Sequence, residues 1–425
     1  MRNCRRVMAA AIVGSIGGLG GEANASGFQV RQNSASGLGT SFAGAAAAAE
    51  DITTIFNNPA GMTRLSGHQA AVVTTAINSS IEFAGGARTS AGAPISGGQE
   101  GDAGTTHLVP AAYLFYDATP DLKFGVAITS PFGLGNDYDD DWVGRYHALS
   151  SRLKTINFNP NIAYRMTRWL SLGGGVVLQY AEARLANAIN STTIAGAPLS
   201  DGRFEVDGDD IGYGFNLGVL LEPRKDTRIG LTYRSKIEQT LEGDIDFTMP
   251  APLAGLPAFR DSNGSASTNL PEVVTFGVYH DLSPQFALMA DIQWTRWSRF
   301  DRLTIVRDDG TIVRNQPQDW DSTFFLAVGA AYKVDDRWSL RAGAAYDQTP
   351  VRDEFRTARI PDEDRYWLSI GAGYKWNDWL QLDAAYAVNF VRDASINEAS
   401  ATGDRLTGTY ESIIHILGVQ VRMRF

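Results

Sequence analysis

The residues that could carry out covalent or metal chemistry are few and scattered. The five histidines are His68, His107, His147, His280 and His415. None lies in an HExxH pattern or another metal-ligand spacing, and we find neither a G-x-S-x-G turn nor a phosphate-binding loop. The sequence therefore predicts no cofactor, no metal site and no enzyme, although a Ser–His pair assembled only by the fold stays open.

The chemistry that the residues do offer is apolar binding. The expected long loop 243–270 is rich in large apolar side chains, namely Phe247, Met249, Leu253, Leu256 and Phe259. Exposed apolar patches mark binding surfaces, so these five side chains are our candidate groove for a hydrophobic molecule. Packing of one loop on another would explain them equally well. The loop 186–206 could form the opposite wall.

Such loops need a scaffold, and the rest of the sequence supplies strands. From about residue 68 onward apolar residues alternate with small or polar ones, as in 286–294 and 380–390. Period 2 places each set on one face of a strand. Aromatic residues near strand ends, Trp294 and Trp297 among them, are typical of the interfacial girdles of a transmembrane barrel. The fold class is therefore predicted to be all-β, and a membrane barrel is favoured over a soluble sandwich.

Counting these segments predicts a 14-stranded antiparallel transmembrane β-barrel. The expected strands are 68–83, 105–117, 121–131, 152–166, 169–185, 207–222, 227–242, 271–281, 285–298, 321–334, 337–348, 364–375, 378–391 and 408–425. Short turns and long connections alternate between them, as in bacterial outer-membrane barrels. The last strand ends at Phe425, and a terminal aromatic residue there is similar to the signal by which barrel-assembly machinery recognises its substrates.

The N-terminal 25 residues are typical of a secretory signal peptide. Arg2, Arg5 and Arg6 precede an apolar stretch, and Ala23-Asn24-Ala25 fits a cleavage site. Cys4, the only cysteine, lies in this region, so the processed chain would have no disulfide. The net charge of -10 argues against nucleic acid as a partner.

Residues 26–67 do not have the pattern of a membrane strand. They are rich in Gly and Ala, and they could be disordered or could fold into the lumen as a hatch. A 14-stranded barrel is wide enough to leak water unless it is filled. The expected organisation is therefore a signal peptide at 1–25, a hatch or plug at 26–67 and a barrel at 68–425.

Several motifs in this order resemble those of the FadL family of outer-membrane hydrophobe transporters. They are Ser26-Gly27-Phe28-Gln29, Asn57-Asn58-Pro59-Ala60-Gly61-Met62, Ser130-Pro131-Phe132-Gly133-Leu134 and Ile360-Pro361-Asp362-Glu363-Asp364-Arg365-Tyr366-Trp367. Asn-Pro-Ala alone is a weak signal, but the ordered set across a 14-strand pattern is specific. The resemblance covers essentially the whole processed chain.

The resemblance implies passive uptake of long-chain fatty acids or, in some branches, of monoaromatic hydrocarbons and other neutral apolar compounds. Ligand would meet an external groove, pass to a pocket at the hatch N-terminus, and leave sideways into outer-membrane lipid through a gap at a kinked third strand. An unplugged aqueous porin and a purely structural barrel are the alternatives from other classes.

The resemblance also assigns roles to residues of this sequence. Phe28 would reach the inner pocket or would be an ordinary packed aromatic. Asn58, Pro59 and Ala60 would form a turn of the hatch. Pro131, Phe132 and Gly133 would form the kink, unless the third strand simply ends there. The candidate cations for the carboxylate of a ligand are Arg184 and Arg341. By the alternation of their strands, Arg184 points outward, and Arg341 points inward near the periplasmic end.

Overall fold

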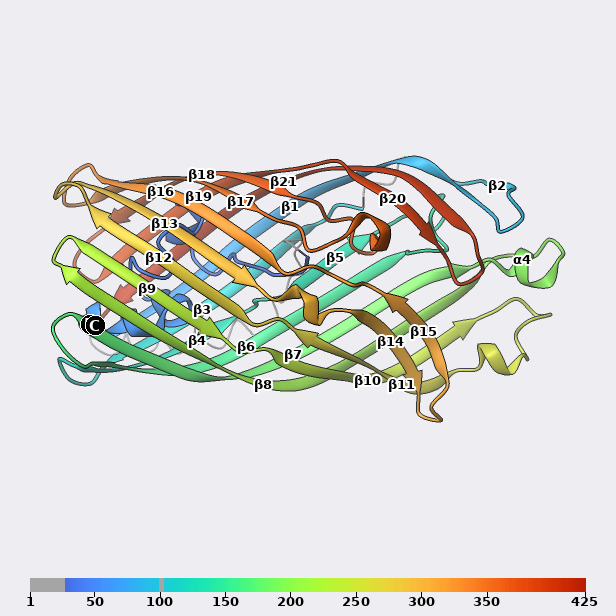
Figure 1. The fold of residues 1–425 in the computed structure, drawn as a ribbon, viewed down its shortest axis with the longest axis horizontal. Coiled ribbons are helices and arrows are strands. Elements are labelled where there is room, and N and C mark those ends of the chain that lie inside the picture. Colours follow the sequence, from blue (N-terminus) through green and yellow to red (C-terminus); the bar gives the residue numbers. More distant parts are fainter. Residues whose placement is uncertain (1–26, 99–102) are drawn as a thin grey trace.

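The computed structural model describes residues 27–98 and 103–425, so the predicted signal peptide lies outside the described residues. The strands form one antiparallel sheet that closes on itself, because β1 (Gln69–Arg88) pairs with both β3 (Thr106–Asp117) and β21 (Arg405–Arg424). The result is the long barrel of Figure 1. Among the described residues, no helix is long and apolar enough to cross a membrane.

The predicted fourteen strands are confirmed within the described part of the chain. Those that run without interruption are β1, β3, β6 (Ser150–Arg165), β7 (Leu170–Ile189), β8 (Gly202–Arg224), β17 (Trp338–Asp347), β18 (Arg365–Lys375) and β21. Each of the others is divided by a short break: β4 and β5 (Leu122–Thr129, Gly133–Asp137), β9 and β10 (Thr227–Arg234, Ile237–Thr248), β11 and β12 (Ser262–Leu270, Val273–Asp281), β13 and β14 (Phe286–Thr295, Arg302–Arg307), β15 and β16 (Ile312–Pro317, Thr323–Lys333), β19 and β20 (Leu380–Val391, Ala394–Ala399).

Short elements complete the connections between strands. The two-residue strand β2 (Pro94–Ile95) pairs with the outer end of β1, and the connecting helices are α4 (Ser191–Ala195), η3 (Pro257–Phe259), η4 (Trp297–Arg299) and η5 (Asp353–Phe355). With the strand breaks, they shape the outer half of the barrel around its lumen.

Six of the seven long connections predicted as loops contain strand residues, and 349–363 is the exception. The range 243–270 contains the end of β10 and all of β11, 299–320 contains β14 and β15, and 392–407 contains β20. The prediction was wrong there because these strands run beyond the membrane. Their outward side chains, such as the exposed Asp244 and Asp246, face water, so the apolar alternation stops although the backbone ladder continues.

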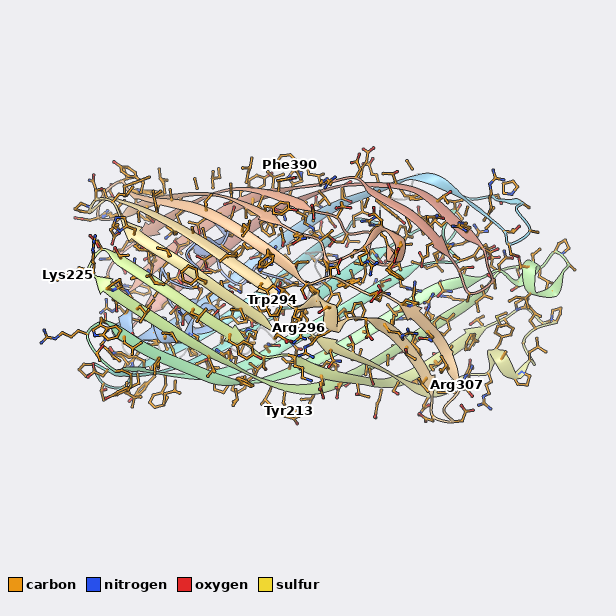
Figure 2. The ribbon with its side chains drawn as sticks, viewed as in Figure 1. Tyr213, Lys225, Trp294, Arg296, Arg307 and Phe390 are labelled. Carbon is orange, nitrogen blue, oxygen red and sulfur yellow. The ribbon has the colours of Figure 1, made fainter. Side chains whose placement is uncertain are left out.

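The outer surface of the wall carries the expected apolar belt. Large exposed apolar side chains lie on successive strands, among them Phe124, Phe158, Leu217, Phe276, Leu326, Leu368 and Leu417. Tyr213 and Phe390 project outward from the wall in Figure 2, and Trp169 and Trp338 are exposed beside short turns. Trp297 is not part of this girdle, because it is fully buried. Its odd position continues the inward parity of the buried Asp291 and Thr295 on the preceding strand.

The N-terminal segment, residues 27–65, lies inside the barrel (Figure 1). It contains α2 (Ala35–Leu38), α3 (Thr54–Asn57) and η2 (Pro59–Arg64). Wall side chains hold its backbone along its length. Asp291 accepts hydrogen bonds from the backbone N–H groups of Gly44 (2.6 Å) and Ala46 (2.9 Å), and the Tyr113 hydroxyl donates to the carbonyl of Asn33 (2.8 Å). The lumen is therefore filled by the chain's own start.

Close approach of this segment to the wall depends on glycines on the inner face. A Cβ added at Gly230 would collide with the carbonyl of Ala46, and one added at Gly343 would collide with the backbone of Thr40. Backbone atoms cannot move aside as the end of a flexible side chain can. A larger residue at either position therefore excludes the segment from its seat.

We expect Gly343→Val to loosen residues 27–65 without opening the barrel. Overpacking of a filled site costs about 1–3 kcal/mol, and here the cost falls on the contact with Thr40. The measurement is tryptic cleavage at Arg31 and Arg64, followed by mass spectrometry, which should become faster. Gly86→Val is the matched control, because nothing lies within 4 Å of a Cβ added there. Equal cleavage rates in the two variants would contradict the expectation.

Candidate ligand-binding site

A large cavity of about 930 Å³ opens on the extracellular side of the barrel. Its walls come from the β7–β8 connection, the end of β10, the β10–β11 connection, β15 and the end of β20. This is the size of a pocket that takes a drug-sized ligand. Apolar side chains line much of it, including Ile189, Ile194, Phe204, Phe247 and Phe259.

The five predicted groove residues are divided by the structure. Phe247 and Phe259 line the cavity, with their ring centroids 5.7 Å apart. Met249, Leu253 and Leu256 are not among its lining residues: Leu253 is buried, Leu256 is exposed, and Met249 packs against Gly202. Packing of the loop on a strand thus accounts for part of the apolar run. The composition of a single segment does not distinguish side chains that pack in this way from side chains that line a cavity.

Arg314 supplies a cation at this cavity, and sequence reasoning missed it. It lies on β15, lines the cavity and donates to the Asn187 side chain (3.5 Å). The neighbouring carboxylate of Glu398, on β20 beyond the apolar belt, accepts from Gln316 (2.9 Å) and from the backbone N–H of Ala358 (2.8 Å). Burial alone would raise the pKa of Glu398, but His147, this N–H group and Arg314 together lower it. Glu398 therefore stays ionised beside Arg314.

Neither predicted carboxylate-binding arginine lines the outer cavity. Arg184 points outward as its parity indicates, is more than half exposed, and pairs with Glu205 at 3.3 Å. Arg341 points inward near the periplasmic end and pairs with Asp383 at 2.8 Å. Position along a strand does not say which acid a nearby strand places beside an arginine, so the sequence could not exclude these pairs.

Phe28 lies at the centre of an aromatic cluster below the outer cavity. The cluster consists of Phe28, Phe132, Trp297, Phe300 and Trp320. The ring of Phe28 lies 4.6 Å from Trp297, 5.5 Å from Phe300 and 5.5 Å from Trp320, between centroids. Phe28 is only 4 % exposed. The N-terminal segment thus fills an apolar site with its own side chain.

The backbone next to Phe28 is anchored by the motif around Ile360–Trp367. The N–H of Gly27 donates to Asp362 (2.8 Å). Asp362 also accepts from Thr349 (2.6 Å) and pairs with Arg365. Asp362 therefore positions the first described residues within the lumen. The motif that contains Asp362 can be recognised in the sequence, but its hydrogen-bond partner in the N-terminal segment, Gly27, cannot.

The third strand is broken at Pro131 and then resumes, so it does not simply end there. The β4–β6 pairing stops at Thr129 and Asn157, and the β5–β6 pairing resumes at Gly133 and Lys154. Four residue steps, from Thr129 to Gly133, lie opposite three, from Asn157 to Lys154. The third strand therefore has one extra residue here, which is a β-bulge. The Thr155 hydroxyl accepts from the N–H of Phe132 (3.1 Å) and donates to its carbonyl (2.6 Å).

The N-terminal segment takes the place of the missing wall partner at this break. The β3–β4 ladder stops at Ala112 and Ile128, although β3 runs on to Thr106. Instead, the N–H of Val30 donates to the carbonyl of Pro131 (2.8 Å), and the N–H of Gly133 donates to the carbonyl of Phe28 (2.9 Å). Residues 28–30 therefore act as a short strand that covers the break in the wall.

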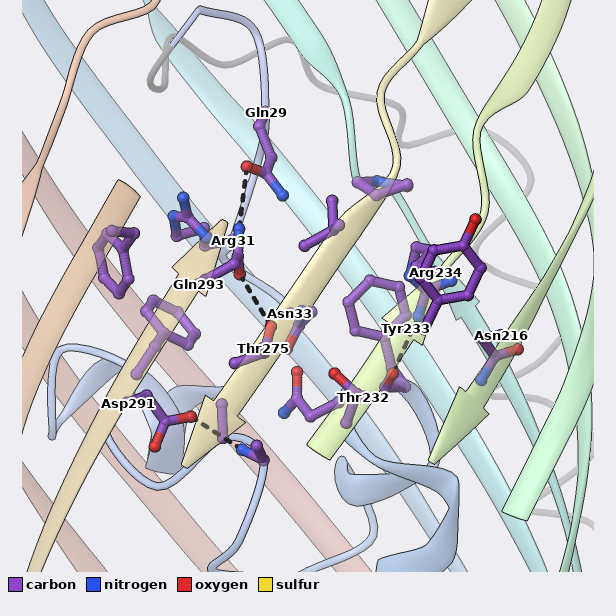
Figure 3. A pocket seen from close by; sticks show the side chains of 18 of the residues that line it. Gln29, Arg31, Asn33, Asn216, Thr232, Tyr233, Arg234, Thr275, Asp291 and Gln293 are labelled. Atoms are coloured by element: carbon purple, nitrogen blue, oxygen red, sulfur yellow. Dashed lines mark hydrogen bonds between the residues drawn. The ribbon is translucent and has the colours of Figure 1, made fainter. Parts of the chain in front are cut away.

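A smaller inner pocket connects these features (Figure 3). It has a volume of about 80 Å³ and is lined by the N-terminal segment, by Pro131 and Phe132 at the break, and by residues of β8, β9, β12, β13 and β16. Gln29, Arg31, Asn33, Arg234, Asp291 and Gln293 surround it in the close view. The pocket holds only a few water molecules, so an acyl chain must displace part of the lining.

The Asn58-Pro59-Ala60 turn is mainly architectural. The Asn58 amide donates to the carbonyls of Ala46 (2.6 Å) and Val219 (3.0 Å), and its oxygen accepts from the N–H of Ala60 (3.1 Å). Pro59 is the first residue of η2, where the missing N–H costs nothing. Pro59 also lines the inner pocket, whereas Asn58 and Ala60 do not.

The 14-stranded barrel, with its broken third strand, filled lumen and aromatic cluster, is similar to known proteins. The profile of the family described as "Outer membrane protein transport protein (OMPP1/FadL/TodX)" matches residues 19–425. The chain belongs to this family. The description is that of a transport protein, which indicates a role other than catalysis, and it places the barrel in the Gram-negative outer membrane.

Individual relatives agree with the assignment. The chain is 30% identical over 437 residues to the outer membrane protein P1 of Haemophilus influenzae, covering 93% of this chain and 94% of that one. It is 29% identical to a long-chain fatty acid transport protein of Escherichia coli O6:H1, covering 85% and 86%. The crystal structure of a Pseudomonas aeruginosa FadL homologue superposes with a TM-score of 0.87 at 27% identity, covering 94% and 100%.

Proposed function

We propose that this protein carries long-chain fatty acids across the outer membrane by passive diffusion. One observation carries the proposal: the N-terminal segment covers a break in the barrel wall and places Phe28 in an apolar site below a large outer cavity. These features would form a route for a hydrophobic molecule, in which the N-terminal segment occupies the apolar site and covers the break in the wall. The segment 26–67 is proposed to act as the hatch.

Capture is proposed to begin in the outer cavity. Transfer of apolar surface out of water is favourable by about 25 cal/mol per Å², and the rings of Phe247 and Phe259 supply the partner surface. Arg314 would hold the carboxylate in a charge-assisted hydrogen bond. This cation favours an acid over a neutral hydrocarbon, and the Escherichia coli relative is a long-chain fatty acid transport protein.

Release is proposed to be lateral. An acyl chain that enters the aromatic cluster competes with Phe28 for the same apolar contacts. When residues 28–30 leave, they release the carbonyl of Pro131 and the N–H of Gly133. They then uncover the break at Pro131, where β3 and β5 are not paired with each other. The ligand would then pass into outer-membrane lipid, the proposed acceptor. No energy source is needed if the ligand moves down its concentration gradient.

Phe425 is proposed to contribute to assembly rather than transport. It is 46% exposed and follows directly on β21, and its N–H donates to the carbonyl of His68 (2.8 Å). Its ring is therefore available to the barrel-assembly machinery.

Uptake by whole cells tests the proposed function. In a strain that lacks its own fatty acid transporters, expression of this protein should restore uptake of radiolabelled palmitate, while liposomes containing the purified protein should not swell in sugar solution. Restored uptake of toluene but not of palmitate would favour the monoaromatic alternative. Rapid sugar flux would favour an aqueous porin, and no uptake of any apolar compound would favour a structural barrel.

A further inference from the structure

Arg234 is an inward-facing cation at membrane depth that forms no salt bridge with any acid among residues 27–98 and 103–425. It is the last residue of β9, and on the outer face of the same strand Leu231 is exposed in the apolar belt. One guanidinium nitrogen, Nη2, donates to the carbonyl of Phe56 (2.9 Å), and the guanidinium lies 4.0 Å from the centroid of the Phe56 ring. The other terminal nitrogen, Nη1, is buried and lacks a hydrogen-bond partner among the described residues.

The charges around the inner pocket leave Arg234 uncompensated. Arg31 also lines this pocket, but it pairs with Asp347 at 3.5 Å. Asp291 lines it too, but both of its oxygens accept backbone N–H groups of the N-terminal segment. In the described part of the chain, Arg234 forms no salt bridge with a carboxylate, and its hydrogen bond goes to a backbone carbonyl.

An unpaired charge of this kind is costly in a membrane protein. Burying a cation without a counter-ion costs several kcal/mol, and ionisable residues at membrane depth mark ligand pathways by default. The cation–π contact with Phe56 offsets only part of that cost. The missing partner is therefore expected to be an anion that is present only during transport.

The position of Arg234 identifies which anion this is. Its guanidinium contacts Phe56 of the N-terminal segment, and Arg234 lines the inner pocket. The same pocket contains Pro131 and Phe132, the residues of the break itself. A molecule that moves from the aromatic cluster to the break therefore passes Arg234 after it has left Arg314.

We infer that Arg234 is an exit-side binding site for the carboxylate of the acyl ligand. This inference rests on the proposed function and adds a second cation to the route, beyond the outer cavity. The unpartnered Nη1 donates to the carboxylate, which neutralises the buried charge while the acyl chain points into the aromatic cluster or into the break.

Binding of a matched acid and alcohol tests the site. Purified full-length protein in lipid nanodiscs is titrated with palmitate and with hexadecanol at pH 8, using the wild type, Arg234→Gln, Arg234→Lys and Arg228→Gln. Arg228 is the matched control, because it lies on the same strand and the same face, is buried, and stacks on Tyr279 (3.6 Å) beside a cavity at the periplasmic end.

Arg234→Gln should lower palmitate affinity about tenfold, as expected for loss of one charge-assisted hydrogen bond, and change hexadecanol affinity less than twofold. Arg234→Lys should retain part of the preference for the acid, and Arg228→Gln should retain all of it. A palmitate analogue with a photoreactive diazirine beside the carboxyl should cross-link to Phe56 or Tyr113 in the wild type and in Arg228→Gln, but not in Arg234→Gln.

Other results separate the two proposals. If Arg234→Gln weakens acid and alcohol equally, the arginine only supports Phe56 and the inference is overturned. If no variant differs from a wild type that binds both ligands, the proposed function stands and the inference is overturned. If the wild type binds neither ligand, the proposed function itself fails.

Discussion

Phe28→Glu is expected to weaken binding of a long-chain fatty acid by at least about tenfold, a loss of about 1.4 kcal/mol, while the barrel still assembles. The carboxylate would have to enter a cluster in which Trp297 is fully buried and Trp320 almost so. An unpaired buried charge costs several kcal/mol, so the start of the hatch should leave the cluster. The site that ligand and Phe28 share would then be distorted and open to water.

The measurement for Phe28→Glu is palmitate binding in nanodiscs, with the resistance of the folded barrel to heat in detergent as the control for assembly. Phe28→Leu is the matched variant, since it keeps an apolar side chain and should bind within a few-fold of the wild type. Unchanged palmitate affinity in Phe28→Glu would reject a role for this site in binding.

Joining the hatch to the wall break by a disulfide is expected to stop transport reversibly. Gln29 and Phe132 are directly opposite in an antiparallel bridge. The hydrogen bonds lie on the flanking residues, as in a non-hydrogen-bonded pair with Cα atoms about 4.5 Å apart. That spacing suits a disulfide. The double variant Gln29→Cys/Phe132→Cys should therefore form a bond that holds residues 28–30 over the break.

Oxidised cells expressing this double variant should take up palmitate at least about tenfold more slowly than reduced cells, as expected when a gating segment cannot move. Each single cysteine variant, which cannot form the bond, gives the baseline for loss of Gln29 or of Phe132. The only other cysteine, Cys4, precedes the predicted cleavage site and would be absent from the processed protein. Equal uptake by oxidised and reduced cells would show that the segment need not leave the wall.

The sequence by itself determined the barrel. Each membrane-spanning strand has an apolar outer face and a small or polar inner face, and this alternation is local, so the fourteen strands could be counted from patterns such as 286–294 and 380–390. The predicted number of strands was right, but the predicted outer ends of the strands were wrong. Beyond the lipid the strands continue with Asp244 and Asp246 facing water, and no local pattern separates such a strand from a loop.

Only the tertiary structure decided how the candidate site is assembled. Phe28 meets Trp297 and Trp320, Gly27 meets Asp362, and residues 28–30 meet the break at Pro131 through contacts between parts of the chain separated by about a hundred residues or more. The same holds for charges, since Arg184 has an acid partner and Arg234 has none within the described residues. Closure of a barrel sets these distances by register and strand tilt, which are properties of the whole sheet and not of any one segment.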